Sequence, residues 1–196
     1  MADRVGILAY GSLIDEPGPE IAPHITHRIA CRTPFKVEFA RTSRTREGGP
    51  TLVPYVEGSE VAAQILVVDL PPKEATDRLY RRERRKVGSN ISYVPPREIT
   101  PDRVVIETLR LFEGVETVLY TRIGANIEGL SAIRLAELAV ASARVRQDGS
   151  AGISYLMNAK KREIQTPLSA EYEKEILRLT GAGSLDAALA CTCAQR

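Results

Sequence analysis

The sequence predicts an α+β protein: a small, mostly antiparallel β-barrel with flanking helices and a helical C-terminal extension. Two observations lead to this class. Short segments with strand-like composition fill most of residues 5–122 and are interrupted by one helical pattern. After Gly129 the apolar residues change to helical spacing. We therefore expect a barrel domain over residues 1–125 and a helical extension, packed on the barrel, over residues 126–196.

The expected strands follow one another with turn residues between them. Residues 5–10 form a continuous apolar run that ends at Gly11, as a buried strand does. Residues 35–40 alternate apolar and polar side chains, which is the period of a half-buried strand. Residues 41–50 are mostly polar or glycine, so we expect a loop there. Similar reasoning predicts strands at residues 51–56, 61–69, 92–94, 104–112 and 117–122.

The helical patterns carry start and stop signals. One helix is expected between the strands, from Pro72 to about residue 87, because proline suits the first helical turn and Gly88 supplies a stop. Ser131 is a candidate N-cap for a helix that extends to residue 147. Two more helices are expected at residues 153–162 and 169–179. These helices are short, so each needs a neighbour to bury its apolar stripe.

The overall composition argues against several classes of protein. Of the 196 residues, 43% are apolar and 27% are charged, an ordinary globular balance. The net charge of +2 is too small to argue for nucleic acid or an anionic membrane as a partner. No apolar stretch is long enough to span a bilayer. Three cysteines give no disulfide framework, so we expect a reducing, cytoplasmic location.

The first candidate site is the turn that follows the opening strand, Tyr10-Gly11-Ser12-Leu13. Successive backbone N–H groups at such a turn can point at one spot and bind a carboxylate or a phosphate. Gly11 lets the backbone approach a ligand closely, because it has no Cβ. Ser12 adds a hydroxyl donor and Tyr10 a flat apolar wall. The alternative is a tight turn at an edge of the barrel with no ligand.

The second candidate is Glu83, a carboxylate on the apolar stripe of the helix expected from Pro72. Every fourth residue of this helix belongs to the stripe, namely Ala75, Leu79, Glu83 and Val87. A buried carboxylate costs several kcal/mol unless it has a partner, and burial raises its pKa. Acid–base chemistry is one reason to keep such a group. The alternative is a structural ion pair, for instance with Arg41 or Arg97.

Two other clusters carry weaker signals. Six cations share the helix of Glu83, namely Arg78, Arg81, Arg82, Arg84, Arg85 and Lys86. We interpret them as a solvated helix face; the alternatives are steering of an anionic substrate or contact with nucleic acid. His24 and His27, with Cys31 nearby, are too few to predict a metal site.

Together the two candidate sites resemble the γ-glutamylcyclotransferase superfamily. The resemblance covers roughly residues 5–122. It rests on an opening strand with a Tyr-Gly-Ser-Leu motif and on a helix that carries Leu-x-x-x-Glu, here Leu79 to Glu83. The other matching segments are Phe39-Ala40-Arg41-Thr42, Thr51-Leu52-Val53-Pro54, residues 61–69, Tyr93-Val94-Pro95-Pro96 and Val118-Leu119-Tyr120.

The resemblance implies intramolecular cyclisation of a γ-glutamyl group, with release of 5-oxoproline and an amine. Glu83 would be the general acid and base, and the residues from Tyr10 to Leu13, with Tyr120, would bind the small γ-glutamyl substrate. No metal or cofactor is implied. The C-terminal helices lie outside the resemblance, and three hypotheses for them are that they cap the pocket, restrict acceptor size or form a homodimer face. The alternative is a non-catalytic member that binds a small ligand or a partner protein.

Overall fold

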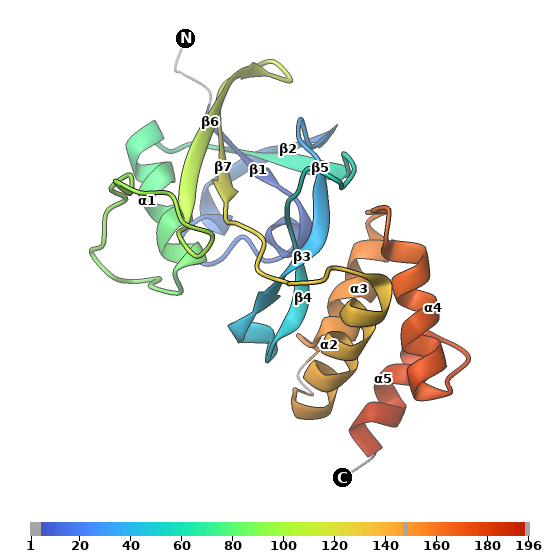
Figure 1. The fold of residues 1–196 in the computed structure, drawn as a ribbon. Helices are drawn as coiled ribbons and strands as arrows, with labels where there is room; N and C mark the ends of the chain where they lie inside the picture. Colours follow the sequence, from blue (N-terminus) through green and yellow to red (C-terminus); the bar gives the residue numbers. More distant parts are fainter. Residues whose placement is uncertain (1–4, 147–148, 195–196) are drawn as a thin grey trace. The chain divides into compact units, whose positions relative to one another are not determined.

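The computed structural model describes residues 5–146 and 149–194, and it confirms a mixed α+β protein (Figure 1). The chain forms two compact units. Unit 1 contains the described residues up to Pro34 together with Ala62–Gly124, and unit 2 contains Phe35–Val61 together with the described residues from Ala125 onward. Segment 35–61 thus groups with the C-terminal helices, although it lies between two strands of unit 1 in the sequence.

Unit 1 is built on a five-stranded sheet with the order β2-β5-β1-β7-β6. Its central strand β1 pairs antiparallel with β5 and parallel with β7. Every residue of β1 is buried, as its continuous apolar run predicts. The strands are β1 (Val5–Ala9), β2 (Ile25–Arg32), β5 (Ala62–Val68), β6 (Val105–Phe112) and β7 (Val115–Arg122).

The expected barrel is not confirmed. Among residues 5–146 and 149–194, the strands form this open five-stranded ladder, with β2 and β6 at its edges, and a separate two-stranded sheet. Strand β2 was not predicted from the sequence. It lies at an edge of the sheet, and most of its side chains are exposed. Because neither face of the strand is buried, its sequence does not alternate between apolar and polar residues.

Helix α1 (Pro72–Glu83) packs on unit 1, and its residues Ala75 and Leu79 are fully buried. It begins at Pro72 as predicted, but it ends at Glu83 instead of near residue 87. The backbone at Arg85 has a φ of 52°, in the left-handed region, which ends the helical hydrogen-bond ladder before Gly88. Val87 is 43% exposed, so the predicted apolar stripe stops at Leu79.

The strand predicted at residues 92–94 is absent from the described structure. The backbone N–H of Tyr93 donates to the Asp77 carboxylate on α1, at 2.7 Å, instead of to a neighbouring strand. The Tyr93 hydroxyl accepts a hydrogen bond from the N–H of Ile106 at 3.1 Å. Residues 84–104 are therefore an irregular segment that side chains fix to α1 and β6.

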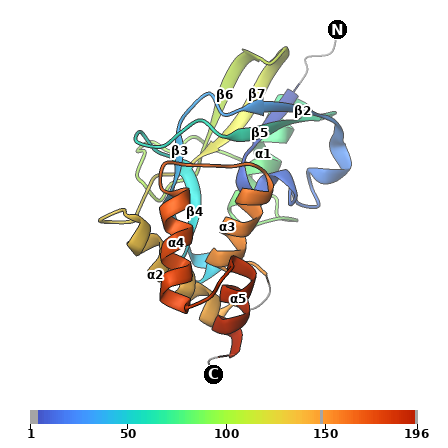
Figure 2. The ribbon, with the colours of Figure 1, turned by 90° about the vertical axis from the view of Figure 1, so that its right-hand side faces the viewer.

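Unit 2 is a β-hairpin with helices packed against it, mainly through β4 (Figure 2). Its core contains the Phe39 ring, which makes edge contacts with Tyr155 and Tyr172 at 6.1 and 5.5 Å between ring centroids. The elements are β3 (Val37–Ser43), β4 (Gly49–Pro54), α2 (Ala132–Val145), α3 (Gly152–Lys161), α4 (Ser169–Thr180) and α5 (Leu185–Ala194).

The helices of unit 2 agree with most of the sequence signals. Ser131 caps α2 as predicted, because its hydroxyl accepts the N–H of Arg134 at 3.2 Å. Helix α5 was not predicted. A local signal for the start of this helix is Ser184, whose hydroxyl accepts the N–H of Ala187 in the first turn.

Glu38 on β3 departs from the predicted alternation. It was expected on the polar face of a half-buried strand, but it is only 1% exposed. Its two carboxylate oxygens accept the N–H of Phe39 at 2.8 Å and the N–H of Leu168 at 3.1 Å. Because Leu168 is the N-cap residue of α4, the carboxylate stabilises the start of that helix.

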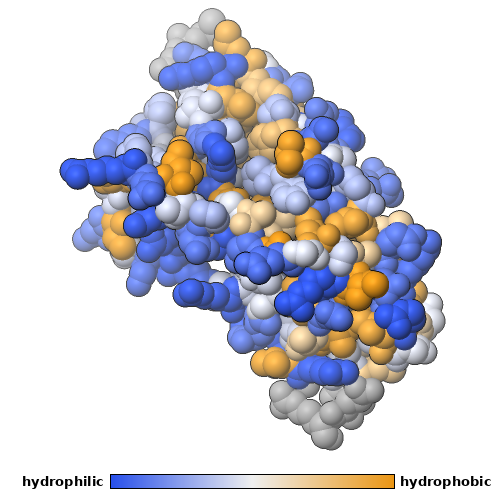
Figure 3. Space-filling view, viewed as in Figure 1, coloured by the Kyte–Doolittle hydropathy of each residue, from blue (hydrophilic) through white to orange (hydrophobic). Residues whose placement is uncertain are grey.

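Polar and apolar side chains are interspersed on the face that Figure 3 shows. Among the described residues, none of the helices combines the length and the apolar character that crossing a membrane requires.

Candidate ligand site at the end of strands β1 and β7

The Tyr10–Leu13 turn follows β1 directly and is held at both ends. Tyr10 is still extended, and Gly11 is buried with a φ of 69°, a left-handed conformation that favours glycine. Residues Gly11–Ile14 form the short 3-10 helix η1, in which Leu13 is buried. The guanidinium of Arg28 on β2 donates to the carbonyl of Ile14 at 2.7 Å, which fixes the far end of the turn. The backbone of the turn predicted from the sequence is therefore joined to β1 at one end and to β2 at the other.

Tyr10 and Tyr120 lie on the same face of neighbouring strands. Gly6 on β1 is in parallel register with Val118 on β7. Because side chains alternate along an extended chain, Tyr10 shares the face of Gly6, and Tyr120 that of Val118. The Tyr10 hydroxyl donates to the carbonyl of Thr121 at 3.2 Å. Two of the predicted substrate-binding residues thus lie beyond the carboxyl end of the paired segments of β1 and β7, and the hydroxyl of Tyr10 contacts the residue that follows Tyr120.

Tyr120 belongs to a hydrogen-bonded cluster with Glu107 and Arg122. Its hydroxyl donates to one oxygen of Glu107 at 2.5 Å, and the Arg122 guanidinium donates to the other at 2.8 Å. The bond from Tyr120 lowers the pKa of Glu107, and Arg122 lowers it further against the opposing effect of burial. Burial and the Glu107 carboxylate together raise the pKa of Tyr120 to about 12. The cluster is therefore a carboxylate that stays ionised between a neutral phenol and a guanidinium.

Sequence reasoning missed Glu107 and Arg122, although a signal for them exists. A turn with Glu113 and Gly114 joins the two predicted strands β6 and β7. If residues are paired one by one outward from this turn, Glu107 lies opposite Tyr120 and diagonally adjacent to Arg122. The structure shows the same register. The hairpin pairing, which the sequence analysis did not use, would have pointed to both residues.

Glu83 is the last residue of α1, and its side chain is 22% exposed. Its carboxylate accepts a hydrogen bond from the Arg82 guanidinium at 2.6 Å. The same guanidinium donates to the carbonyl of Glu16, at 2.8 Å, in the segment that follows the Tyr10–Leu13 turn. This arginine thus connects Glu83 with the neighbourhood of the turn. Glu83 thus forms an ion pair, the alternative considered from the sequence, but its partner is the adjacent Arg82 and not Arg41 or Arg97.

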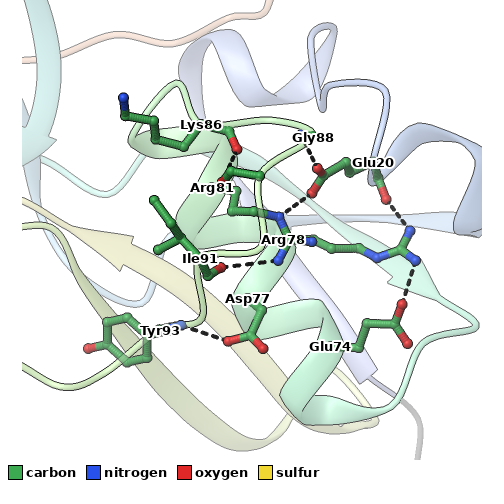
Figure 4. Close-up of polar contacts among 10 residues, drawn as sticks. Glu20, Glu74, Asp77, Arg78, Arg81, Lys86, Gly88, Ile91 and Tyr93 are labelled. Carbon is green, nitrogen blue, oxygen red and sulfur yellow. Dashed lines mark hydrogen bonds and ion pairs between the residues drawn. The ribbon is translucent and has the colours of Figure 1, made fainter.

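Three arginines of α1 are bound to groups of unit 1, contrary to the expected solvated face. Figure 4 shows Arg78 and Arg81 converging on Glu20. Arg81 donates to the Glu20 carboxylate at 2.7 Å, Arg78 donates to its backbone carbonyl at 2.6 Å, and both side chains are less than 20% exposed. Together with Arg82, they are occupied within the protein. This weakens the interpretation of the cluster as a nucleic-acid surface.

Glu20 also holds the segment that follows Glu83. Its second carboxylate oxygen accepts the N–H of Gly88 at 2.5 Å, and Arg81 donates to the carbonyl of Ile91 at 3.2 Å (Figure 4). Burial alone would raise the pKa of Glu20, but the Gly88 N–H and the Arg81 guanidinium hold it below its ordinary value. The chain that follows Glu83 is therefore tied to the face of α1.

His24 and His27 do not form a metal site with Cys31 in the described structure. The Nδ1 atom of His24 lies 2.8 Å from the Asp69 carboxylate. Over residues 5–146 and 149–194, no group of three or more His, Cys, Asp or Glu side chains is arranged to hold a metal ion.

Comparisons with known proteins found no relative of this chain. No protein-family model, no curated protein and no solved structure matches the chain. The resemblance to the γ-glutamylcyclotransferases therefore rests on the motifs of the sequence. The geometry of Tyr10, Tyr120 and Glu83 is the basis on which a function can be proposed.

Proposed function

We propose that the protein is a γ-glutamylcyclotransferase-like enzyme. Glu83 removes a proton from the α-ammonium group of a γ-glutamyl substrate, and the freed nitrogen attacks the γ-carbonyl carbon. The new C–N bond closes the five-membered ring of 5-oxoproline, and the old amide C–N bond breaks. Glu83 then gives its proton to the nitrogen of the departing amine, and the second proton lost by the ring nitrogen also goes to that amine, which leaves as an ammonium ion. The chain mainly has to hold the glutamyl group in a ring-closing conformation, because nucleophile and electrophile belong to one molecule.

The observation that carries this proposal is the joint placement of the turn and Tyr120. Tyr10 and Tyr120 lie on one face of the parallel pair β1 and β7, and Gly11 leaves the backbone of the turn without a Cβ. Such a turn suits the α-carboxylate of a glutamyl group and a developing oxyanion. Support for Glu83 is its half-buried position in the same unit, linked through Arg82 to the segment after the turn.

The barrel remains part of the proposal. We infer that the sheet of unit 1 curls so that its edge strands approach one another. Burial raises the pKa of Cys31 on edge strand β2 to about 11, and the negative charge of Glu113 contributes to the shift. Glu113 lies in the turn between β6 and β7, at the other side of the ladder. A curled sheet brings this turn towards β2, and this is the arrangement that we propose.

We also propose the domain organisation, the location and the oligomeric state that the family resemblance and the sequence suggest. This proposal comprises a γ-glutamylcyclotransferase-like barrel domain over residues 1–125, a C-terminal extension over 126–196, cytoplasmic location, homodimer formation, and no need for a metal or a cofactor. Size-exclusion chromatography with light scattering tests the homodimer.

The direct test is release of 5-oxoproline from a panel of γ-glutamyl amino acids, peptides and amines. We expect the wild-type chain to release it and Glu83→Gln to lower the rate by roughly a hundredfold or more, because general acid–base catalysis contributes that much. The control is Glu98→Gln, an exposed carboxylate of the same unit, which leaves the rate unchanged. Undiminished release by a folded Glu83→Gln variant would assign the acid–base role to another residue.

One observation favours a second candidate, a non-catalytic protein that binds a small acidic ligand or a partner protein. Arg82 pairs with Glu83 at 2.6 Å, so the Glu83 carboxylate is already engaged by a guanidinium of the protein itself. In that case the wild-type chain binds γ-glutamyl compounds or another small acid but releases no 5-oxoproline. Calorimetric binding, measured beside the release assay, separates the two functions.

A further inference from the structure

Arg82 joins Glu83 to the chain that follows the turn of the proposed site. Its Nη1 atom donates to one carboxylate oxygen of Glu83 at 2.6 Å. On the other edge of the same guanidinium, Nη2 and Nε donate to the carbonyl of Glu16 at 2.8 and 3.3 Å. The N–H of Glu16 in turn donates to the carbonyl of Ser12 at 2.9 Å. A chain of hydrogen bonds thus runs from Ser12 in the turn to the carboxylate of Glu83.

The Arg82 side chain is suited to this bridge and is held in it. A guanidinium is a rigid planar group whose N–H donors point in fixed directions, so it serves two acceptors on different edges at once. The side chain is only 18% exposed. A Cβ at Gly18 would lie 3.3 Å from Cγ of Arg82, so the segment after the turn packs closely on the arginine stem. Packing and hydrogen bonds therefore fix the guanidinium together.

The second carboxylate oxygen of Glu83 is open. Among residues 5–146 and 149–194, no group donates a hydrogen bond to it, and the side chain is 22% exposed. Glu83 is also the last residue of α1, where the helix dipole disfavours a negative charge, so a cation is needed to hold the carboxylate there. One oxygen held and the other open is the arrangement that a general base requires.

We propose that Arg82 is a positioning residue of the cyclisation reaction. It holds the Glu83 carboxylate at a fixed distance from the Tyr10–Leu13 turn, so that the open oxygen takes the proton from the α-ammonium group of the glutamyl substrate. This inference rests on the proposed function and adds the part that places the base relative to the substrate. The contact between Arg82 and Glu83 then serves catalysis, whereas in the non-catalytic candidate it merely neutralises the carboxylate.

The test measures kcat and KM for release of 5-oxoproline by the full chain. The probes are γ-glutamylalanine, glutathione and γ-glutamylbutylamine, and the variants are compared on the one that the wild-type chain turns over fastest. We expect Arg82→Gln to lower kcat on the order of 10- to 100-fold, because a displacement of about 1 Å costs a catalytic group that much. KM stays within about twofold, because Arg82 does not touch the substrate.

Two further variants separate the bridge from its charge. Arg82→Lys keeps the charge but lacks the planar fork that serves Glu16 and Glu83 together, so kcat recovers only in part. Arg84→Gln removes the same charge on the other side of Glu83. Arg84 is exposed and donates to the hydroxyl of Tyr80 at 3.0 Å, and its loss leaves kcat unchanged. Circular dichroism shows that each variant is folded.

A double variant separates positioning from damage to the pocket. The same probe is bound to Glu83→Gln and to Glu83→Gln with Arg82→Gln, and calorimetry measures both dissociation constants. If Arg82 acts only through Glu83, the two constants agree within about twofold. A distorted pocket would instead bind the probe more weakly once Arg82 is replaced.

Several outcomes would overturn the proposal. Release by the wild type with an unchanged kcat in Arg82→Gln overturns the positioning role and retains the reaction. An equal loss of kcat in Arg84→Gln shows that charge near Glu83 matters and the bridge does not. A loss that appears in KM or in the dissociation constant assigns Arg82 to substrate binding instead. If the wild type releases no 5-oxoproline from any probe, the reaction itself is overturned, and the role of Arg82 in it with it.

Discussion

Replacement of Glu38 by glutamine should destabilise unit 2, because its two oxygens serve two different backbone groups. Glutamine offers one carbonyl oxygen, so the N–H of Phe39 or that of Leu168 would face an amide NH₂ instead of an acceptor. A buried N–H left without a partner costs about 1–3 kcal/mol. Loss of the negative charge at the start of α4 adds about 0.3–1 kcal/mol.

One term opposes this loss, since a neutral amide is less costly to bury than a carboxylate. We therefore expect Glu38→Gln to lower the free energy of unfolding by roughly 2 kcal/mol. Glu38→Ala, which leaves both N–H groups unpaired, should lower it further. Glu57→Gln, an exposed carboxylate in the same unit, should stay within about 0.5 kcal/mol of the wild type.

Urea unfolding, followed by the near-ultraviolet circular dichroism of the tyrosines, measures these differences. Tyr155 and Tyr172 lie against Phe39 in the core of unit 2, so the signal reports on the packing that Glu38 supports. The reasoning is refuted if Glu38→Gln unfolds at the same urea concentration as Glu57→Gln. It is also refuted if the alanine variant is the more stable of the two at Glu38.

Two further predictions concern unit 1. Gly6→Ala should lower the free energy of unfolding by about 1–3 kcal/mol, because the added Cβ would lie 2.4 Å from a methyl group of buried Ile65. Thermal unfolding measures the loss, and the control is Gly183→Ala, where the added Cβ meets no atom within 4 Å. Equal unfolding midpoints of the two variants would contradict the prediction. Since the pKa of Glu20 is lowered in the folded state, its stabilising effect is complete above its ordinary value of 4.5 and is lost as the pH falls below it. Urea titrations from pH 7 to pH 3 should show wild type and Glu20→Gln converging, and a constant gap over that range would argue against the ion pair with Arg81.

Features set by neighbours in the sequence were predicted well. The apolar run before Gly11 is β1, Pro72 starts α1 and Ser131 caps α2. In each case the physical cause lies within one or two turns of chain, where capping and side-chain periodicity act. The Tyr10–Leu13 turn was found for the same reason, because its glycine and the preceding strand are adjacent in the sequence.

Features set by distant partners were missed. Glu38 looked like a solvent-facing residue, because its partner Leu168 lies 130 residues away. Strand β2 depends on the backbone of β5 rather than on a buried face of its own. For the candidate site, the sequence predicted Tyr10 from its turn and Tyr120 from the family resemblance, but the shared face and the Glu107 contact follow only from strand register.

The discontinuity of unit 2 has a consequence for synthesis on the ribosome. Glu38 emerges 130 residues before Leu168, which at translation rates of 5–20 residues per second is a delay of roughly 7 to 26 s. During that time the hairpin of β3 and β4 lacks the helices that later cover the ring of Phe39. Hairpins form in microseconds but are marginally stable alone. The apolar side chains around Phe39 on the nascent hairpin therefore stay uncovered until the helices that carry Tyr155 and Tyr172 have been synthesised.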